Sequence, residues 1–387
     1  MKDKIKGVNL GGWLVLEKWM TPALFEGVES DDEYYLALDL PENEYKTRIK
    51  LHRDYFITEA DFIRIAAIGI NTVRIPVPYF IFGDRPPYIE CVSYLDKAFK
   101  WAEKTGLKIL IDLHTAPLSQ NGFDNGGISG VCRWAQIPQE VEFVLEVLEK
   151  LSKRYGENQS LWGIQVLNEP ATPIIWENMN PQKRYPPRDE KLASGSKAIS
   201  LEFLFDFYEK AYIRMRQYLP LDKKVVFHDG FELEIWEDFF KNGNYENVVL
   251  DTHQYLMMAE LTGTRQEVNE YVRFLLMLKD KIETVSKYVD VCVGEWSLFN
   301  SYAVGIDTNG GINPTAVNYE GNVKRTHNEL VAIYQKLWEE SVNSWNAGIG
   351  YFYWTYKLNI DTVNNPEWFG WDSWDFDRCF SQEWIKL

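Results

Sequence analysis

Short apolar runs and longer amphipathic segments alternate along the chain. Eight runs have the length of β-strands, and they lie at Lys6–Leu14, Asn71–Val77, Lys108–His114, Leu161–Leu167, Lys223–His228, Asn247–His253, Val289–Gly294 and Gly348–Trp354. Most of them are nearly continuous in hydrophobic residues. This pattern is typical of strands that are buried on both faces, as in a parallel sheet.

Patterns of amphipathic helices separate most of these runs. The segment "ITEADFIRIAAIGI" has Thr58 at its start, Asp61 three residues later and Gly69 near its end, which predicts a capping box and a glycine stop. Further helices are predicted for "SYLDKAFKWAEKTG", "PQEVEFVLEVLEKLSKRYG", "LEFLFDFYEKAYIRMRQYLP" and "THNELVAIYQKLWEESVNSWNAG". Strands that alternate with helices indicate parallel pairing through crossover connections.

Eight strand–helix units predict an α/β fold, a (β/α)8 or TIM barrel that forms one domain over residues 1–387. An open doubly wound sheet is the alternative. The barrel is favoured because no GxGxxG loop follows the first strand, and because polar residues stand at the carboxyl ends of nearly all strands. Two long segments, 171–198 after the fourth strand and 297–325 after the seventh, are expected to shape that rim.

Composition says more about the binding partners of the protein than about its fold. The 387 residues carry a formal net charge of −16, which argues against nucleic acid and anionic membranes as partners. The first residues, "MKDKIKGVNL", contain no apolar signal region, so a cytoplasmic monomer is expected unless a leader was removed. Aromatic residues make up 15% of the chain, and they fit either a large core or a cleft that stacks on sugar rings.

Polar residues gather where the predicted strands end. In chain order they are Glu17, Arg74, His114, Asn168, Glu169, His228, Asp229, His253, Tyr255, Glu295 and, with an aromatic ring, Trp354. Each one alone has a structural interpretation as a cap, a salt-bridge partner or a core residue. Together they indicate a site, because buried polar groups at this density are costly unless they bond each other or a ligand.

Two of these residues, Glu169 and Glu295, end the fourth and seventh strands. Paired carboxylates at about 5–5.5 Å perform retaining glycoside hydrolysis, in which one is a protonated acid and the other an ionised nucleophile. Arg74 is suited to hold the nucleophile and lower its pKa, Asn168 to bond the sugar 2-OH, and Tyr255 to orient the nucleophile. Pro170 then turns the chain away from the rim.

Other chemistries fit the sequence less well. A metal site would draw on His114, His228, Asp229, His253 and Glu295, but the first strand, "GVNLGGW", lacks the usual HxH pair. No GxSxG elbow is present. A non-catalytic carbohydrate-binding barrel would have no reason to hold two carboxylates together against their repulsion. We therefore expect an enzyme without metal or cofactor.

A set of motifs then identifies a family. In order along the chain, these are "GVNLGGWLVLEKWMTPALFEG", "NTVRIPV", "DLHTAPLSQNGFDNGG", "VLNEP", "FHDGF", "VGEWS" and "PEW". The chain resembles glycoside hydrolase family 5 of clan A, and most closely its exo-β-1,3-glucanase branch. The resemblance covers nearly the whole chain, and the ordered set is far more specific than "LNEP" alone.

The resemblance implies Glu169 as acid/base and Glu295 as nucleophile. It also implies a shell around the sugar to be cleaved, made of Arg74, His114, Asn168, His253, Tyr255 and Trp354. Glu17 would bind the non-reducing end and make the enzyme exo-acting, and Phe123 would form one face of an aromatic entrance clamp. Met258 departs from the family, whose members usually have a second clamp aromatic there.

The expected function is therefore a retaining exo-acting glucan 1,3-β-glucosidase that cleaves a β-glucan oligosaccharide or a small β-glucoside. The alternatives within the family are a β-1,6-glucanase, a diglycosidase and a glycolipid glucosidase. Fungal members of this branch are exported, whereas no secretion signal is visible here.

Overall fold

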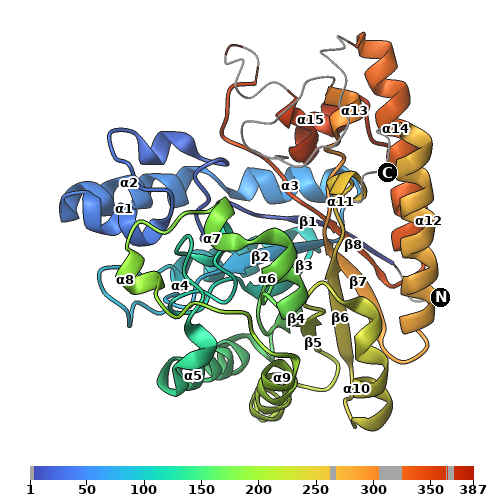
Figure 1. The fold of residues 1–387 in the computed structure, drawn as a ribbon. Coiled ribbons are helices and arrows are strands. Elements are labelled where there is room, and N and C mark those ends of the chain that lie inside the picture. Colours follow the sequence, from blue (N-terminus) through green and yellow to red (C-terminus); the bar gives the residue numbers. More distant parts are fainter. Residues whose placement is uncertain (1–3, 262–266, 305–324, 363, 365–369) are drawn as a thin grey trace. The chain divides into compact units, whose positions relative to one another are not determined.

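The computed structural model describes residues 4–261, 267–304, 325–362, 364 and 370–387 (Figure 1). Its strands follow one another in chain order around a closed barrel, which confirms the (β/α)8 prediction. The strands are β1 (Ile5–Asn9), β2 (Thr72–Val77), β3 (Lys108–Leu113), β4 (Leu161–Gln165), β5 (Lys224–His228), β6 (Val248–His253), β7 (Asp290–Glu295) and β8 (Gly350–Tyr353).

All eight predicted strands are present, but seven of them are shorter than their apolar runs, as β1 and β4 illustrate. β1 ends at Asn9 instead of continuing to Leu14, because the chain turns at Gly12, which has a φ of +72°. β4 ends at Gln165, although the backbone N–H of Val166 still donates to the carbonyl of Val226 at 3.0 Å. Apolar character therefore continues past the end of regular pairing.

By its internal contacts the chain divides into two compact units, residues 10–250 and residues 1–9 with 251–387. That residues 1–387 form a single domain stays a prediction. The two units are described in turn.

The unit of residues 10–250 contains β2 to β5. Its α-helices are α1 (Glu33–Asp39), α2 (Glu42–Tyr55), α3 (Glu59–Ala67), α4 (Val92–Thr105), α5 (Pro138–Tyr155), α6 (Pro173–Met179), α7 (Pro181–Arg184), α8 (Glu190–Ala193), α9 (Leu201–Met215) and α10 (Trp236–Asn242). Short 3-10 helices lie at η1 (Pro22–Phe25), η2 (Asp124–Gly126), η3 (Trp134–Gln136) and η4 (Leu233–Ile235). Helices α6 to α8 occupy the segment 171–198 that was expected as a rim loop.

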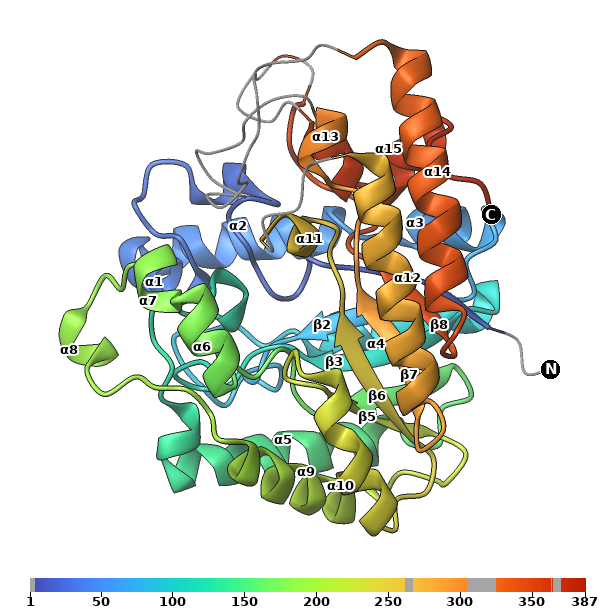
Figure 2. The same ribbon diagram turned by 45° about the vertical axis from the view of Figure 1, so that its right-hand side comes forward.

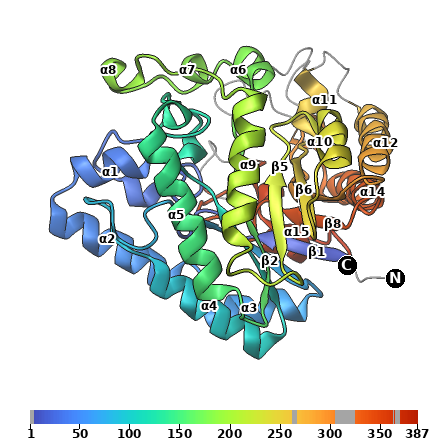
Figure 3. The ribbon, with the colours of Figure 1, turned by 90° about the horizontal axis from the view of Figure 1, so that it is seen from below.

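Local sequence explains the helices that were predicted in this unit. The backbone N–H and hydroxyl of Thr58 donate to Asp61 at 2.7 and 2.8 Å, which completes the capping box of α3. Helix α4 ends at Gly106, whose φ of +77° is left-handed. Helices α5 and α9 lie side by side (Figure 3) and bury the apolar faces that their periodicity predicts.

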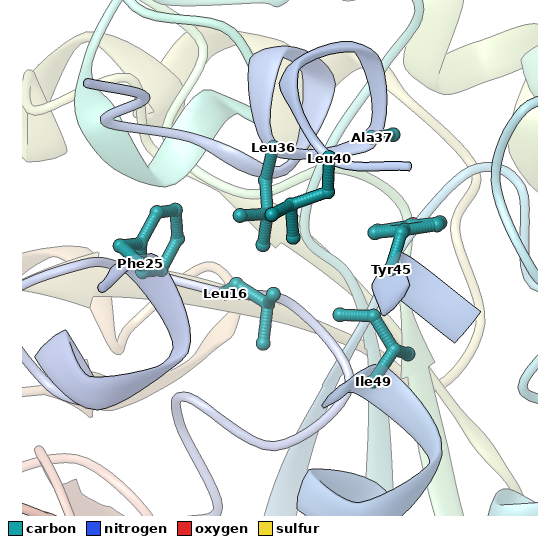
Figure 4. Close-up of a cluster of buried hydrophobic side chains, with 7 residues drawn as sticks. All are labelled: Leu16, Phe25, Leu36, Ala37, Leu40, Tyr45 and Ile49. Carbon is teal, nitrogen blue, oxygen red and sulfur yellow. The ribbon is translucent and has the colours of Figure 1, made fainter. Parts of the chain in front are cut away.

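Helices α1 and α2 were not among the predicted elements. With the segment before them they enclose a small core of their own (Figure 4), formed by Leu16, Phe25, Leu36, Ala37, Leu40, Tyr45 and Ile49. A buried ion pair lies in the same region, where Arg53 approaches Glu33 at 3.3 Å.

The unit of residues 1–9 and 251–387 contains β1, β7 and β8, and β8 pairs in parallel with both of the others. Its helices are α11 (Met257–Leu261), α12 (Val268–Val285), α13 (Ser301–Val304), α14 (His327–Trp345), η6 (Trp371–Trp374) and α15 (Phe376–Ser381). Helices α12 and α14 lie side by side (Figures 1 and 2). The predicted helix α14 begins with a capping box between Thr326 and Glu329.

Two segments named in the sequence analysis lie outside the described residues. The first is residues 305–324, which make up most of the predicted rim loop 297–325, and the second is the "PEW" motif at residues 366–368. Within the described ranges, none of the helices combines the length and apolar character needed to cross a membrane.

Candidate active site

The carboxyl ends of β2, β3 and β4 carry a closed ring of hydrogen bonds. From Arg74 on β2, the guanidinium donates to Asn168 Oδ1 at 2.7 Å and lies 3.1 Å from Asp112 Oδ2. Asp112 Oδ2 is 2.5 Å from His114 Nδ1, and His114 Nε2 is 3.4 Å from Asn168 Nδ2, which closes the ring. All four side chains are fully buried. The predicted site residues Arg74, His114 and Asn168 are thus brought together.

This ring determines the state of its histidine. Because Nδ1 faces the carboxylate of Asp112, Nδ1 carries the proton, and Nε2 offers its lone pair to the amide of Asn168. The remaining Nε–H of Arg74 donates to Gln165 Oε1 at 2.9 Å. Each member therefore has a fixed orientation, as a rim that must hold a sugar in one pose requires.

The backbone that follows β4 is fixed as firmly as the side chains. The N–H of Asn168 donates to the carbonyl of Leu113 at 3.0 Å, and the amide of Gln120 donates to the carbonyls of His114 and Asn168, both at 2.9 Å. Glu169 then adopts a left-handed φ of +41°, which is strained for a residue with a side chain. The strain persists because its neighbours on both sides are anchored.

The Glu169 carboxylate is nearly buried and has a partner that sequence reasoning missed. Asn125 donates its side-chain amide to Glu169 Oε2 at 2.6 Å, and Asn121 in turn donates to Asn125 Oδ1 at 2.9 Å. Both asparagines come from the "SQNGFDNGG" segment after β3. No periodicity marks such loop residues, and only the density of amides in that segment hints at them.

The second glutamate, Glu295 at the end of β7, belongs to the other unit. The hydroxyl of Tyr255 donates to Glu295 Oε2 at 2.7 Å, and His253 Nδ1 lies 3.5 Å from the same oxygen. The opposite ring nitrogen of His253 lies 3.3 Å from Asp251 Oδ2. The backbone N–H of Gln254 donates to the carbonyl of Glu295 at 2.9 Å. The predicted residues His253, Tyr255 and Glu295 therefore form one hydrogen-bonded group.

A glycine makes room for this group. A Cβ atom on Gly294 would lie 2.2 Å from both carboxylate oxygens of Asp251. Only glycine permits the aspartate to stand beside β7 and support His253. The Cys292 thiol also donates to Asp251, at 3.6 Å, which gives this buried cysteine a structural partner.

Sequence reasoning overlooked Asp112 and Asp251, although a signal was available. Each precedes a rim histidine by two positions, in "DLH" and in "DTH". Residues two apart on a strand point to the same face, so each aspartate lies beside its histidine inside the barrel. Both ring nitrogens of His114 and of His253 face protein side chains as a result.

The remaining predicted residues take separate places. Trp354 follows β8, and its backbone N–H donates to the carbonyl of Trp296 at 2.7 Å. Glu17 is 4% exposed and accepts a hydrogen bond from the indole of Trp19 at 2.8 Å. Phe123 is 7% exposed, with the ring of Tyr185 6.0 Å away between centroids. Phe123 therefore does not present an exposed aromatic face in this structure.

Comparison with known proteins agrees with these observations. A (β/α)8 barrel with one hydrogen-bonded glutamate shortly after β4 and another at the end of β7 has the framework of a glycoside hydrolase. The family model "Cellulase (glycosyl hydrolase family 5)" matches residues 38–187. The chain belongs to glycosyl hydrolase family 5 and is a β-glycosidase.

Curated relatives extend the match over nearly the whole chain. It is 33% identical to "probable glucan 1,3-beta-glucosidase A" of Emericella nidulans, over 97% of this chain and 89% of that protein. It is 32% identical to the glucan 1,3-beta-glucosidase of Blumeria graminis, over 95% of this chain and 84% of that protein. Among solved structures, rutinosidase from Aspergillus niger shares the fold with a TM-score of 0.74, 21% identity, and coverage of 99% and 98%.

These relatives correct one expectation. A cytoplasmic location was inferred from the first ten residues alone, and that inference is wrong. The chain aligns with glucan 1,3-β-glucosidases of fungi, the branch whose fungal members are exported. The start of a sequence is poor evidence for location compared with similarity over the whole chain.

Proposed function

We propose that this β-glycosidase is a retaining, exo-acting glucan 1,3-β-glucosidase in which Glu295 is the nucleophile and Glu169 the acid/base. The names of the curated relatives support the substrate class. The observation that carries the assignment of roles is the difference between the two carboxylates. Glu295 accepts a hydrogen bond from Tyr255 and lies near His253, whereas Glu169 accepts from the neutral amide of Asn125.

The environment of Glu295 suits a nucleophile. A hydroxyl that donates to a carboxylate favours its ionised form and fixes its orientation. In the first step the Glu295 carboxylate bonds to the anomeric carbon while the bond to the leaving oxygen breaks and Glu169 gives that oxygen its proton. In the second step water gives a proton to Glu169 and bonds to the anomeric carbon, and Glu295 is released.

The residues around these glutamates would hold the terminal sugar. Asn168 Oδ1 is already bonded to Arg74 and one amide N–H faces His114, so the other N–H is the part suited to the sugar 2-OH. The buried Glu17 carboxylate, steadied by Trp19, can accept from two neighbouring hydroxyls that are free only at a non-reducing end. This arrangement favours release of one glucose at a time.

Two variants test the mechanism directly. Glu295→Ala should abolish turnover, and added azide should restore some activity by forming the α-glucosyl azide, since azide replaces the lost nucleophile. Glu169→Ala should slow substrates with poor leaving groups far more than 2,4-dinitrophenyl β-glucoside, which needs no proton. Near-normal turnover of Glu295→Ala, or equal losses on both substrates for Glu169→Ala, would show that the roles are wrong.

Product analysis tests exo action and linkage. Laminari-, gentio- and cello-oligosaccharides are digested in parallel, and the products are followed over time together with their anomeric configuration. Glucose in the β configuration as the first product, from laminari-oligosaccharides above the others, is expected. A ladder of intermediate products would refute exo action. Preference for gentio-oligosaccharides, or release of an intact disaccharide from its glycoside, would instead favour a β-1,6-glucanase or a diglycosidase.

A further inference from the structure

The segment that contains α7 packs closely on the segment after β3. The rings of Tyr185 and Phe123 have centroids 6.0 Å apart, with their planes inclined by 53°. Nearby, Gln182 donates its side-chain amide to the carbonyl of Gly130 at 3.2 Å. A Cβ atom on Gly130 would come within 2.5 Å of the Tyr185 carbonyl oxygen, so glycine is needed for this approach. Tyr185 is therefore held in one place at the rim.

Charged neighbours hold Tyr185 on its other side. The Arg184 guanidinium lies 5.7 Å from the centroid of the Tyr185 ring. The Asp124 carboxyl lies next to both residues: burial raises its pKa, while Arg184 and a hydrogen bond from the Tyr185 hydroxyl act in the opposite direction. These contacts fix both the plane of the ring and the direction of its hydroxyl.

This cluster is linked to the acid/base through Asn125. Asp124 precedes Asn125, whose amide holds Glu169 Oε2 at 2.6 Å. The acid gives its proton to the oxygen of the leaving group, so side chains next to it are placed to contact that group. Phe123 is 7% exposed, whereas Tyr185 is partly exposed. Of this pair, Tyr185 is therefore the more exposed residue.

We propose that Tyr185, held by Asp124 and Arg184, is the surface on which the leaving-group sugar stacks, and that it determines which β-linked sugars the enzyme releases and accepts. The proposal rests on the proposed function. An aromatic ring binds the C–H face of a pyranose, and a fixed hydroxyl at its edge can bond a sugar hydroxyl. The loop after β4 thereby becomes part of substrate recognition.

Transfer of glucose to an added sugar tests this site whichever linkage the natural substrate has. With β-glucosyl fluoride as donor, the C–F bond breaks, fluoride leaves with the electron pair, and Glu295 bonds to the anomeric carbon. An acceptor hydroxyl of methyl β-glucoside then bonds to that carbon and gives its proton to Glu169, and the ester to Glu295 breaks. Fluoride needs no leaving-group site, but the acceptor sugar does.

Hydrolysis of β-glucosyl fluoride, which has no leaving-group sugar, is the reference reaction for each variant. Tyr185→Ala should lower the ratio of transfer to hydrolysis, and kcat/KM for laminaribiose relative to that for β-glucosyl fluoride, by about five- to tenfold, the scale of one lost aromatic contact. Tyr185→Phe keeps the ring and should lose less than about twofold. Tyr218→Ala is the matched control, because Tyr218 lies between α9 and β5, at the amino ends of the strands, and is also partly exposed.

The outcomes separate this proposal from the one on which it rests. An unchanged transfer ratio in Tyr185→Ala, or equal losses on fluoride and laminaribiose, overturns the role of Tyr185 while the glycosidase mechanism stands. A similar loss in Tyr218→Ala also overturns it. If the wild-type enzyme does not turn over β-glucosyl fluoride, the proposed function fails and this inference fails with it.

Discussion

Replacing Asp32 by asparagine should change how stability depends on pH. Asp32 caps α1, where its Oδ1 accepts from the N–H of Tyr35 at 3.0 Å, and its Oδ2 accepts from the N–H of Ser129 at 2.8 Å. It is 1% exposed, and burial raises its pKa from 3.8 to about 6 even though these N–H donors favour the ionised form. Asparagine is also a good N-cap, but it carries no charge.

The sign follows from the direction of the shift. The folded protein holds the proton of Asp32 more tightly than the unfolded chain, so the resulting stabilisation is complete below pH 3.8 and is lost as pH rises through 6. A shift of this size corresponds to about 3 kcal/mol in the free energy of unfolding. The stability of the wild type minus that of Asp32→Asn should therefore fall by about 3 kcal/mol as pH rises to 7.

Urea unfolding followed by tryptophan fluorescence at pH 4, 5, 6 and 7 measures this difference. The neighbouring acids Asp31 and Glu33 are present in both proteins, so to first order their contributions to the free energy of unfolding cancel in the comparison. The loss of the bond to Ser129 adds an offset that does not depend on pH. A difference that stays constant between pH 4 and 7, or that grows in favour of the wild type, would refute the reasoning.

Three further predictions concern the site. Asn125→Ala should lower kcat/KM for laminaribiose about 10- to 100-fold, because the hydrogen bond that positions the Glu169 acid is lost, but should spare 2,4-dinitrophenyl β-glucoside. Equal losses on both substrates would exclude a positioning role. Gly294→Ala should destabilise the protein by about 1–3 kcal/mol, since its Cβ would meet the Asp251 carboxylate, and an unchanged Tm would contradict this. Exhaustive chelation should leave kcat unchanged, whereas loss with recovery on adding zinc would revive the metallohydrolase interpretation.

The barrel could be predicted because its strands satisfy one strong constraint. Strands covered on both faces must be apolar nearly throughout, and all six residues of β2 are buried. Helices with clear caps, such as α3 and α14, could be predicted equally well. Helix α2 was missed because its sequence, "ENEYKTRIKLHRDY", is largely polar and buries His52 and Arg53 along with its few apolar residues. Its contacts are made with partners that no periodic pattern reveals.

The candidate site was predictable to a similar extent. Glu169 and Glu295 stand at strand ends, where the barrel places functional groups, and the motifs around them are specific. Asn125 and Tyr185 are loop residues, and their positions depend on how two segments about 60 residues apart pack on each other. Sequence patterns show where strands end, but they do not show which rim loops contact each other.

The ring of Arg74, Asp112, His114 and Asn168 also restricts how this enzyme can change over generations. In a closed ring each member has two partners, so any single replacement breaks two contacts and leaves buried polar groups unpaired on both sides. No one-step path leads from this ring to a different working arrangement. Diversity within the family should therefore arise in the rim loops, while these four positions persist or change together.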